Sequence, residues 1–222
     1  MFDAILFDCD GVLVDSEPIT LAVLTQSLNE AGWAITLAEC TAHFLGRAVK
    51  DQAKLFLEMT GQSLTDAWLI KFREARDKAL SAQLKVIPGV HEFVEFAHKR
   101  FDSKIACASG ADRVKIELQL RKVDLIKWFE GRIFSGHEMP RTKPAPDVYL
   151  AAAMHLNIKP KYCLVIEDTP TGVQAGVQAG ATVWAYLSDT NAQRVQASQL
   201  IDAGAQRIFT HIDQLHQHLM DC

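Results

Sequence analysis

The stretch that decides the fold lies near the start of the chain and reads Ala4-Ile5-Leu6-Phe7-Asp8-Cys9-Asp10-Gly11-Val12-Leu13-Val14-Asp15. Its first four residues form a short uncharged run, which is typical of a strand buried in a parallel sheet. Side chains alternate along extended backbone, so Asp8 and Asp10 are expected to point to the same side. Gly11 then permits a tight turn. Open α/β sheets bind ligands at the carboxyl ends of their strands, where this pair of carboxylates would lie.

Two different patterns follow this stretch. Residues 17–84 contain only helical patterns, which end near glycines or carry apolar residues at helical spacing. From residue 86 onward helical patterns alternate with strand-like runs at 103–108, 133–135, 163–166, 182–186 and 208–209. This alternation predicts an α/β fold with a doubly wound parallel sheet. We therefore expect a Rossmann-like core domain made of residues 1–16 and 85–222, with an all-helical domain at 17–84 inserted after the first strand.

Composition argues against several classes of protein. The 222 residues are 49% hydrophobic and 23% charged, with a formal net charge of −4. Such a chain can bury a sizeable core, and it lacks the clustered basic face of a nucleic-acid-binding protein. No apolar run approaches the roughly 18 residues of a membrane helix, and the acidic N-terminal stretch does not resemble a signal peptide. We expect no nucleic-acid or membrane partner, and a monomer or weak dimer.

The cysteines indicate the compartment. There are five of them, and no pair has Cys-x-x-Cys spacing. Neither a disulfide framework nor a zinc site is therefore predicted. Cys9, Cys107 and Cys163 lie in or beside strand-like runs, so we expect buried thiols in a reducing cytoplasm. The two carboxylates beside Cys9 would raise its pKa rather than activate it as a nucleophile.

Three further polar segments follow later strand-like runs. They are Ser109-Gly110, Lys143 and the pair Glu167-Asp168. Taken singly, each has an ordinary explanation as a loop, a solvated charge, or acids favoured at a helix N-terminus; Asp8 and Asp10 could likewise be solvated residues at a strand end. Only a parallel sheet would bring all these segments to one crevice.

In this order the segments resemble the four motifs of the haloacid dehalogenase superfamily, in its β-phosphoglucomutase-like phosphatase branch. The resemblance covers nearly the whole chain, and the helical block resembles the cap domain of that family. It implies that Asp8 is the nucleophile that accepts a phosphoryl group and that Asp10 is the general acid and base. It also implies that Ser109, Gly110 and Lys143 hold the phosphoryl oxygens.

The same resemblance implies a Mg²⁺ cofactor. Its ligands would be the Asp8 carboxylate, the Asp10 backbone carbonyl and Asp168, with Glu167 bound to the ion or just behind it. The chemistry agrees, because a carboxylate nucleophile repels an anionic phosphate ester and a divalent cation between them offsets the repulsion.

The expected activity is that of a phosphoric monoester hydrolase. A phosphosugar mutase of the β-phosphoglucomutase type is the alternative, but that enzyme carries a histidine early in its first cap helix where this chain has Thr20. A 2-haloacid dehalogenase, with Asp8 attacking carbon and no metal, and a non-catalytic binding module are less favoured. Fold alone does not decide between them.

Substrate choice is expected to depend on the helical domain. The segment containing Gly46, Arg47 and Lys50 resembles the specificity loop of the family's cap. The two basic residues could contact a phosphate or a polar leaving group, or could be a solvated pair at a helix start. We expect a small phosphorylated sugar, sugar acid or polyol as substrate.

Overall fold

A computed structural model of the chain describes residues 2–44, 49–192 and 195–221. The chain divides into two compact units, one made of Met1–Asp15 with Lys85–Cys222 and the other of Ser16–Leu84. We call them the sheet unit and the helical unit and describe each by itself.

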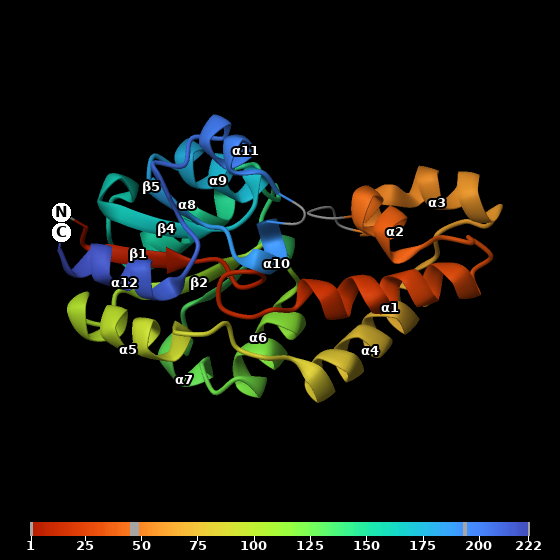
Figure 1. The fold of residues 1–222 in the computed structure, drawn as a ribbon, viewed down its shortest axis with the longest axis horizontal. Helices are drawn as coiled ribbons and strands as arrows, with labels where there is room; N and C mark the ends of the chain where they lie inside the picture. Colours follow the sequence, from red (N-terminus) through yellow and green to blue (C-terminus); the bar gives the residue numbers. More distant parts are fainter. Residues whose placement is uncertain (1, 45–48, 193–194, 222) are drawn as a thin grey trace. The chain divides into compact units, whose positions relative to one another are not determined.

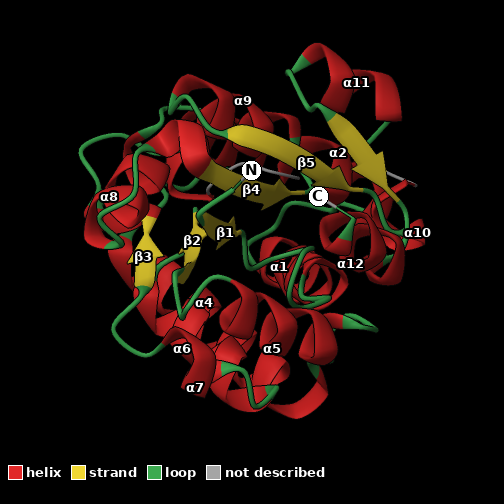
Figure 2. Cartoon of the chain, turned by 90° about the vertical axis from the view of Figure 1, so that its left-hand side faces the viewer, coloured by secondary structure: helices red, strands yellow, loops and turns green. Residues whose placement is uncertain are grey.

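The sheet unit contains six parallel strands in the order β3-β2-β1-β4-β5-β6 (Figure 2). In chain order they are β1 (Ala4–Phe7), β2 (Ile105–Ser109), β3 (Ile133–Ser135), β4 (Cys163–Glu167), β5 (Thr182–Tyr186) and β6 (Arg207–Phe209). The chain builds outward from β1 through β2 and β3, then crosses to the other side of β1 for β4. The predicted doubly wound parallel sheet is confirmed, and its switch point lies between β1 and β4, where such sheets bind ligands.

Helices cover both faces of the sheet (Figures 1 and 2). One face carries α8 (Asp147–His155), α9 (Pro170–Gln178) and α11 (Ala197–Asp202), and the other carries α5 (Val90–Arg100), α6 (Arg113–Lys122), α7 (Ile126–Phe129) and α12 (Ile212–Met220). This double cover explains why the strands are uncharged: all four β1 residues are buried. Phe7 of β1 makes edge-on contacts with Phe93 of α5 and Phe129 of α7.

Strand register decides which residues end at the same level. Phe7 lies opposite Cys107 of β2 and Ile166 of β4. The residue that follows each of them, Asp8, Ala108 or Glu167, is therefore at the same carboxyl edge of the sheet. Both β2 and β4 extend one residue beyond the predicted strands, to Ser109 and Glu167.

Several short helices and turns were not predicted from the sequence. The helices α7 and α10 (Asp189–Ala192) each have four residues, and two 3₁₀ turns, Gly136–Glu138 and Pro160–Tyr162, have three. A single turn is too short for apolar residues to repeat at helical spacing.

The helical unit contains α1 (Glu17–Glu30), α2 (Leu37–Phe44), the 3₁₀ turn η1 (Val49–Gln52), α3 (Ala53–Thr60) and α4 (Asp66–Gln83). Its apolar core includes Leu24, Leu28, Trp33, Phe56 and Phe72. The turn η1 leads directly into α3.

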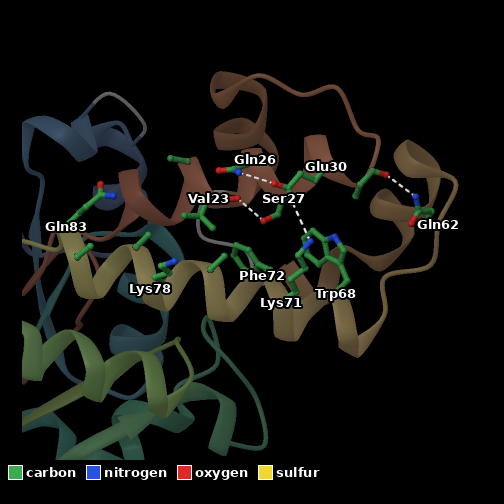
Figure 3. Close-up of a pocket in the computed structure, with 15 residues that line it drawn as sticks. Val23, Gln26, Ser27, Glu30, Gln62, Trp68, Lys71, Phe72, Lys78 and Gln83 are labelled. Atoms are coloured by element: carbon green, nitrogen blue, oxygen red, sulfur yellow. Dashed lines mark hydrogen bonds and ion pairs between the residues drawn. The ribbon is translucent and has the colours of Figure 1, made fainter.

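A cavity of about 640 Å³ lies between α1 and α4 within the helical unit (Figure 3). Val23, Trp68 and Phe72 supply apolar wall, and Lys71 and Glu30 form an ion pair at 3.7 Å. None of the described residues that line this cavity is a predicted site residue. Within the described ranges, no helix combines the length and the apolar composition needed to cross a membrane.

Candidate active site

Lys143 joins the ends of three neighbouring strands. Its Nζ donates to Asp8 Oδ1 at 2.7 Å, to Glu167 Oε1 at 2.6 Å and to the Ala108 carbonyl at 3.1 Å. Asp8 follows β1, Ala108 lies near the end of β2, and Glu167 ends β4. Only 9% of the Lys143 side chain is exposed. The parallel sheet thus brings together residues separated by more than a hundred positions, as the sequence analysis predicted.

Tyr149 of α8 completes this network. Its hydroxyl accepts from Lys143 at 3.0 Å and donates to Glu167 Oε1 at 2.8 Å, while its ring lies 4.7 Å from the Lys143 ammonium. Burial raises the pKa of Tyr149 well above its ordinary value, and the nearby Glu167 adds to the effect. The phenol therefore stays protonated and can donate. No motif in the sequence marked this residue.

The start of α9 is built around Glu167. The Oε2 atom of Glu167 accepts from the backbone N–H of Asp168 at 2.9 Å and from that of Thr169 at 3.2 Å. Thr169 caps α9 by accepting from the Gly172 N–H at 3.1 Å. A Cβ atom at Gly172 would overlap the Glu167 carboxylate, so only glycine fits there. The helix N-terminus favours the negative charge that Glu167 brings to it.

Asp8, Glu167 and Asp168 form a buried group of carboxylates. Each offers an oxygen within 4.8 Å of the oxygens of the other two. The pKa of Asp8 is raised to about 7, chiefly by burial; Lys143 opposes the shift, and Glu167 and Asp10 add to it. Burial alone would lower the pKa of Lys143, but Asp8 and Glu167 hold it well above its ordinary value. Hard oxygen donors with negative charge in excess fit a Mg²⁺ ion.

Asp10 is held by a different element, α6. Lys115 Nζ donates to both carboxylate oxygens of Asp10, at 2.8 and 2.9 Å, and Gln119 Nε2 donates to Oδ1 at 2.7 Å. Lys115 is only 7% exposed and Gln119 is fully buried. Neither residue belongs to a motif that predicts a site. Their four-residue spacing beside the apolar Ile116 and Leu120 was the available signal, because it places two polar side chains on the buried face of a helix.

The buried thiols match the sequence analysis. Cys9, Cys40, Cys107 and Cys163 are free and buried. Cys9 Sγ donates to Gln119 Oε1 at 3.5 Å. A hydrogen bond with Cys107 and burial raise the pKa of Cys9 well above its ordinary value, and the neighbouring carboxylates contribute less. Cys9 is thus a packed thiol rather than a nucleophile.

The predicted phosphate loop follows the carbonyl that Lys143 contacts. Ser109 is buried at the end of β2, and its hydroxyl accepts from the Ala111 N–H at 3.2 Å. Ser135 of β3 donates to the Ala111 carbonyl at 2.6 Å. A Cβ at Gly136 would lie 3.1 Å from the Gly110 Cα, so glycine allows these two backbone segments to approach closely. Gly110 itself is exposed.

The predicted specificity residues belong to the helical unit. Thr20 lies in α1 with its Oγ1 buried and without a hydrogen-bond partner among the described residues. Lys50 lies in η1 and is exposed. Gly46 and Arg47 lie outside the described residues. The roles of all four stay predictions.

Comparison with known proteins shows which family this chain resembles. The profile of the haloacid dehalogenase-like hydrolase family matches residues 2–180, which include every polar segment described above for the sheet unit. The chain is 25% identical to 6-phosphogluconate phosphatase of Escherichia coli, over 96% of this chain and 92% of that protein. It is 27% identical to the phosphorylated carbohydrates phosphatase of Thermotoga maritima, over 91% of this chain and 92% of that one.

A solved structure extends the comparison to three dimensions. The crystal structure of a HAD family hydrolase from Deinococcus radiodurans, determined with bound phosphate and sodium, has a TM-score of 0.79 to this chain. The two chains are 32% identical, and the match covers 99% of this chain and 96% of that one.

Proposed function

The chain belongs to the haloacid dehalogenase-like hydrolase family, and from that premise we propose that it is a Mg²⁺-dependent phosphatase that works through an aspartyl-phosphate on Asp8. The observation that carries the proposal is the buried Lys143, bonded to both Asp8 and Glu167 with Asp168 close by. Phosphoryl transfer depends on positioning and electrostatics more than on covalent chemistry by the protein. A fixed carboxylate with a lysine beside it supplies both.

In the first step Asp8 attacks phosphorus in line. A bond forms between an Asp8 carboxylate oxygen and phosphorus while the bond from phosphorus to the leaving oxygen breaks, and Asp10 gives that oxygen a proton. Lys143 neutralises charge on Asp8 and on the phosphoryl group, and Ser109 with the backbone of Gly110 holds phosphoryl oxygens. Mg²⁺ bound by Asp8, Asp168, Glu167 and the Asp10 carbonyl would supply the positive charge that lets an anionic ester approach Asp8.

In the second step water releases the phosphoryl group. Asp10, ionised by the first step, takes a proton from a water molecule as the water oxygen bonds to phosphorus and the bond to Asp8 breaks. The products are an alcohol and inorganic phosphate, and both aspartates return to their starting states.

We place the substrate among small phosphorylated sugars, sugar acids and polyols. Two relatives are named for such compounds, 6-phosphogluconate and phosphorylated carbohydrates. Hydrolysis is favoured over a mutase reaction, because Thr20 stands where the resembling mutase has a histidine and a threonine cannot replace its acid and base chemistry.

The test is phosphate release by the purified protein with Mg²⁺, from p-nitrophenyl phosphate and from a panel of sugar, sugar-acid and polyol phosphates. Asp8→Asn should lower turnover of every substrate by several orders of magnitude, because loss of a nucleophile removes the covalent route. Asp3→Asn is the matched control: it is the same change at an exposed position just before β1, and turnover should be unchanged.

Other reaction products would identify a different activity. Isomerisation of a sugar phosphate without phosphate release would identify a mutase, and metal-independent chloride release from a haloacid would identify a dehalogenase. Activity retained by Asp8→Asn would refute the nucleophile.

A further inference from the structure

Asp8 and Asp10 lie two residues apart, yet each is held by its own lysine from a different part of the sheet unit. Lys143, which precedes α8, binds Asp8, and Lys115 of α6 binds Asp10. The two helices α8 and α6 cover opposite faces of the sheet (Figure 2). The two aspartates are thus held by donors from different elements.

The Asp10 carboxylate is bonded at both oxygens. Lys115 spans Oδ1 and Oδ2 at 2.8 and 2.9 Å, and Gln119 adds a second donor to Oδ1 at 2.7 Å. These donated hydrogen bonds from Lys115 and Gln119 fix the plane of the Asp10 carboxylate as well as its position, because each bond prefers its own lone-pair direction.

Gln119 and Lys115 are themselves fixed by hydrogen bonds. Gln119 is fully buried, and its Oε1 accepts from the Cys9 thiol at 3.5 Å, which directs its Nε2 toward Asp10. Lys115 lies in the first turn of α6, and its backbone N–H donates to the Asp112 carboxylate at 3.0 Å. Burying a lysine and a glutamine at four-residue spacing is costly unless both are bonded, so this pair is explained by its contact with Asp10.

We propose that Lys115 and Gln119 are positioning residues that set the direction in which Asp10 transfers its proton, an inference that rests on the proposed function. The proton must pass between Asp10 and an oxygen within about 3 Å on a defined line. With its carboxylate free to rotate, Asp10 would reach that geometry less often, although Asp8 could still attack phosphorus.

The consequence differs between the two steps and between substrates. p-Nitrophenyl phosphate loses a stable phenolate and needs little proton donation, so Asp8 can be phosphorylated without a well-placed Asp10. Hydrolysis of the aspartyl-phosphate still requires Asp10 as a base. An alkyl ester such as glycerol phosphate requires the proton in the first step as well.

The experiment is pre-steady-state kinetics of Lys115→Met with Mg²⁺. We expect a burst approaching one nitrophenolate per enzyme, followed by a steady state about 10- to 100-fold slower than wild type, a partial loss of the roughly 10²–10⁴-fold that general acid–base catalysis contributes. Turnover of glycerol phosphate should fall further than that of p-nitrophenyl phosphate. Gln119→Leu should lower the turnover of both esters as well. Lys115→Arg retains the charge and the donors, so it should recover part of the steady-state rate that Lys115→Met loses.

Lys122→Met is the matched control, since it makes the same change at an exposed position of the same helix. A steady-state rate of Lys115→Met within twofold of this control would overturn the inference. An equal loss in the burst rate and in the steady-state rate would overturn it too, because it would indicate that the whole site is disturbed. Wild-type protein inert toward both esters would overturn the proposed function and this inference with it; active wild type with an unaffected Lys115→Met overturns the inference alone.

Discussion

At the scale of single residues, the carboxylates of Asp8, Asp10 and Glu167 each have a defined lysine partner. Lys143 binds two carboxylates, a carbonyl and a phenol, and Tyr149 links Lys143 to Glu167. A buried ion pair is weak evidence for stability, because desolvation offsets much of the attraction. Such a network is better understood as fixing Asp8 and Glu167 for chemistry, with Tyr149 orienting a proposed metal ligand.

Tyr149→Phe removes only the hydroxyl that orients Glu167. We expect Mg²⁺ affinity to fall about 10- to 100-fold, as is typical when a group that orients a metal ligand is lost. We also expect a loss of about 1–3 kcal/mol in the free energy of unfolding, because a buried charged group loses a hydrogen bond. Calorimetric Mg²⁺ titration and urea denaturation measure the two effects. Tyr162→Phe, at a 40% exposed tyrosine, is the control, and equal behaviour of the two variants would contradict the role.

At the scale of elements, α6 matters because it carries the partners of Asp10 in its first two turns. Asp112 caps this helix by accepting from the Lys115 N–H at 3.0 Å. Helices begin with unsatisfied N–H groups, and a capping carboxylate satisfies one of them and complements the helix dipole. The same cap therefore stabilises α6 and fixes the turn that contains Lys115.

Asp112→Ala should lower the free energy of unfolding by about 1 kcal/mol, within the 0.5–2 kcal/mol usual for loss of a cap. Turnover should fall as well, because fraying of the first turn displaces Lys115. Asp112→Asn keeps a capping oxygen and should restore most of both losses. Urea denaturation and steady-state phosphatase assays give the comparison. If the asparagine variant is as impaired as the alanine variant, capping is not the cause.

At the scale of the whole molecule, the sheet assembles a site that no segment contains by itself. The switch point between β1 and β4 brings Asp8 beside Glu167 and Asp168, and β2 adds Ala108 on the other side of β1. Burial, with a smaller contribution from the neighbouring carboxylates, raises the pKa of Asp8 to about 7 in the folded protein, so folding and proton binding are interdependent. The proposed metal binding would be coupled to both.

The stability of the metal-free protein should fall with rising pH in this window. Folded Asp8 retains its proton up to about pH 7, whereas the unfolded side chain loses it near its model value of 3.8. Between these values the folded state binds more protons, so the free energy of unfolding declines as pH increases. The contribution is complete below the unfolded pKa and is lost as pH passes through the folded one.

Mg²⁺ should reverse this trend, because it competes with the proton for Asp8. At a concentration 100 times its Kd the ion adds about 2.7 kcal/mol, and about 2–4 °C of Tm per kcal/mol is usual for a chain of this size. We expect the Mg²⁺-induced rise in Tm, measured by thermal unfolding, to be larger at pH 8 than at pH 5. Asp8→Asn should remove most of the difference. An equal rise at both pH values would contradict the coupling.

The sequence by itself determined the strands, the alternation that makes the sheet parallel, and the polar residues that end β1, β2 and β4. These features are local: an uncharged run, a turn residue and a repeat at helical spacing can be recognised within about ten residues. The parallel sheet then required Asp8, Lys143 and Glu167 to meet, and they do. Short helices such as α7 were missed because one turn has no periodicity.

Only the tertiary structure decided which side chains hold the two aspartates. The spacing of Lys115 and Gln119 indicates in sequence that they share a helix face but not what they contact, and Tyr149 looks like a core aromatic. Their contacts with Asp10 and Glu167 span between 18 and 109 positions. Such pairings depend on which face of α6 or α8 turns toward the end of β1. Packing of the helix against the sheet, rather than the local sequence, sets this rotation.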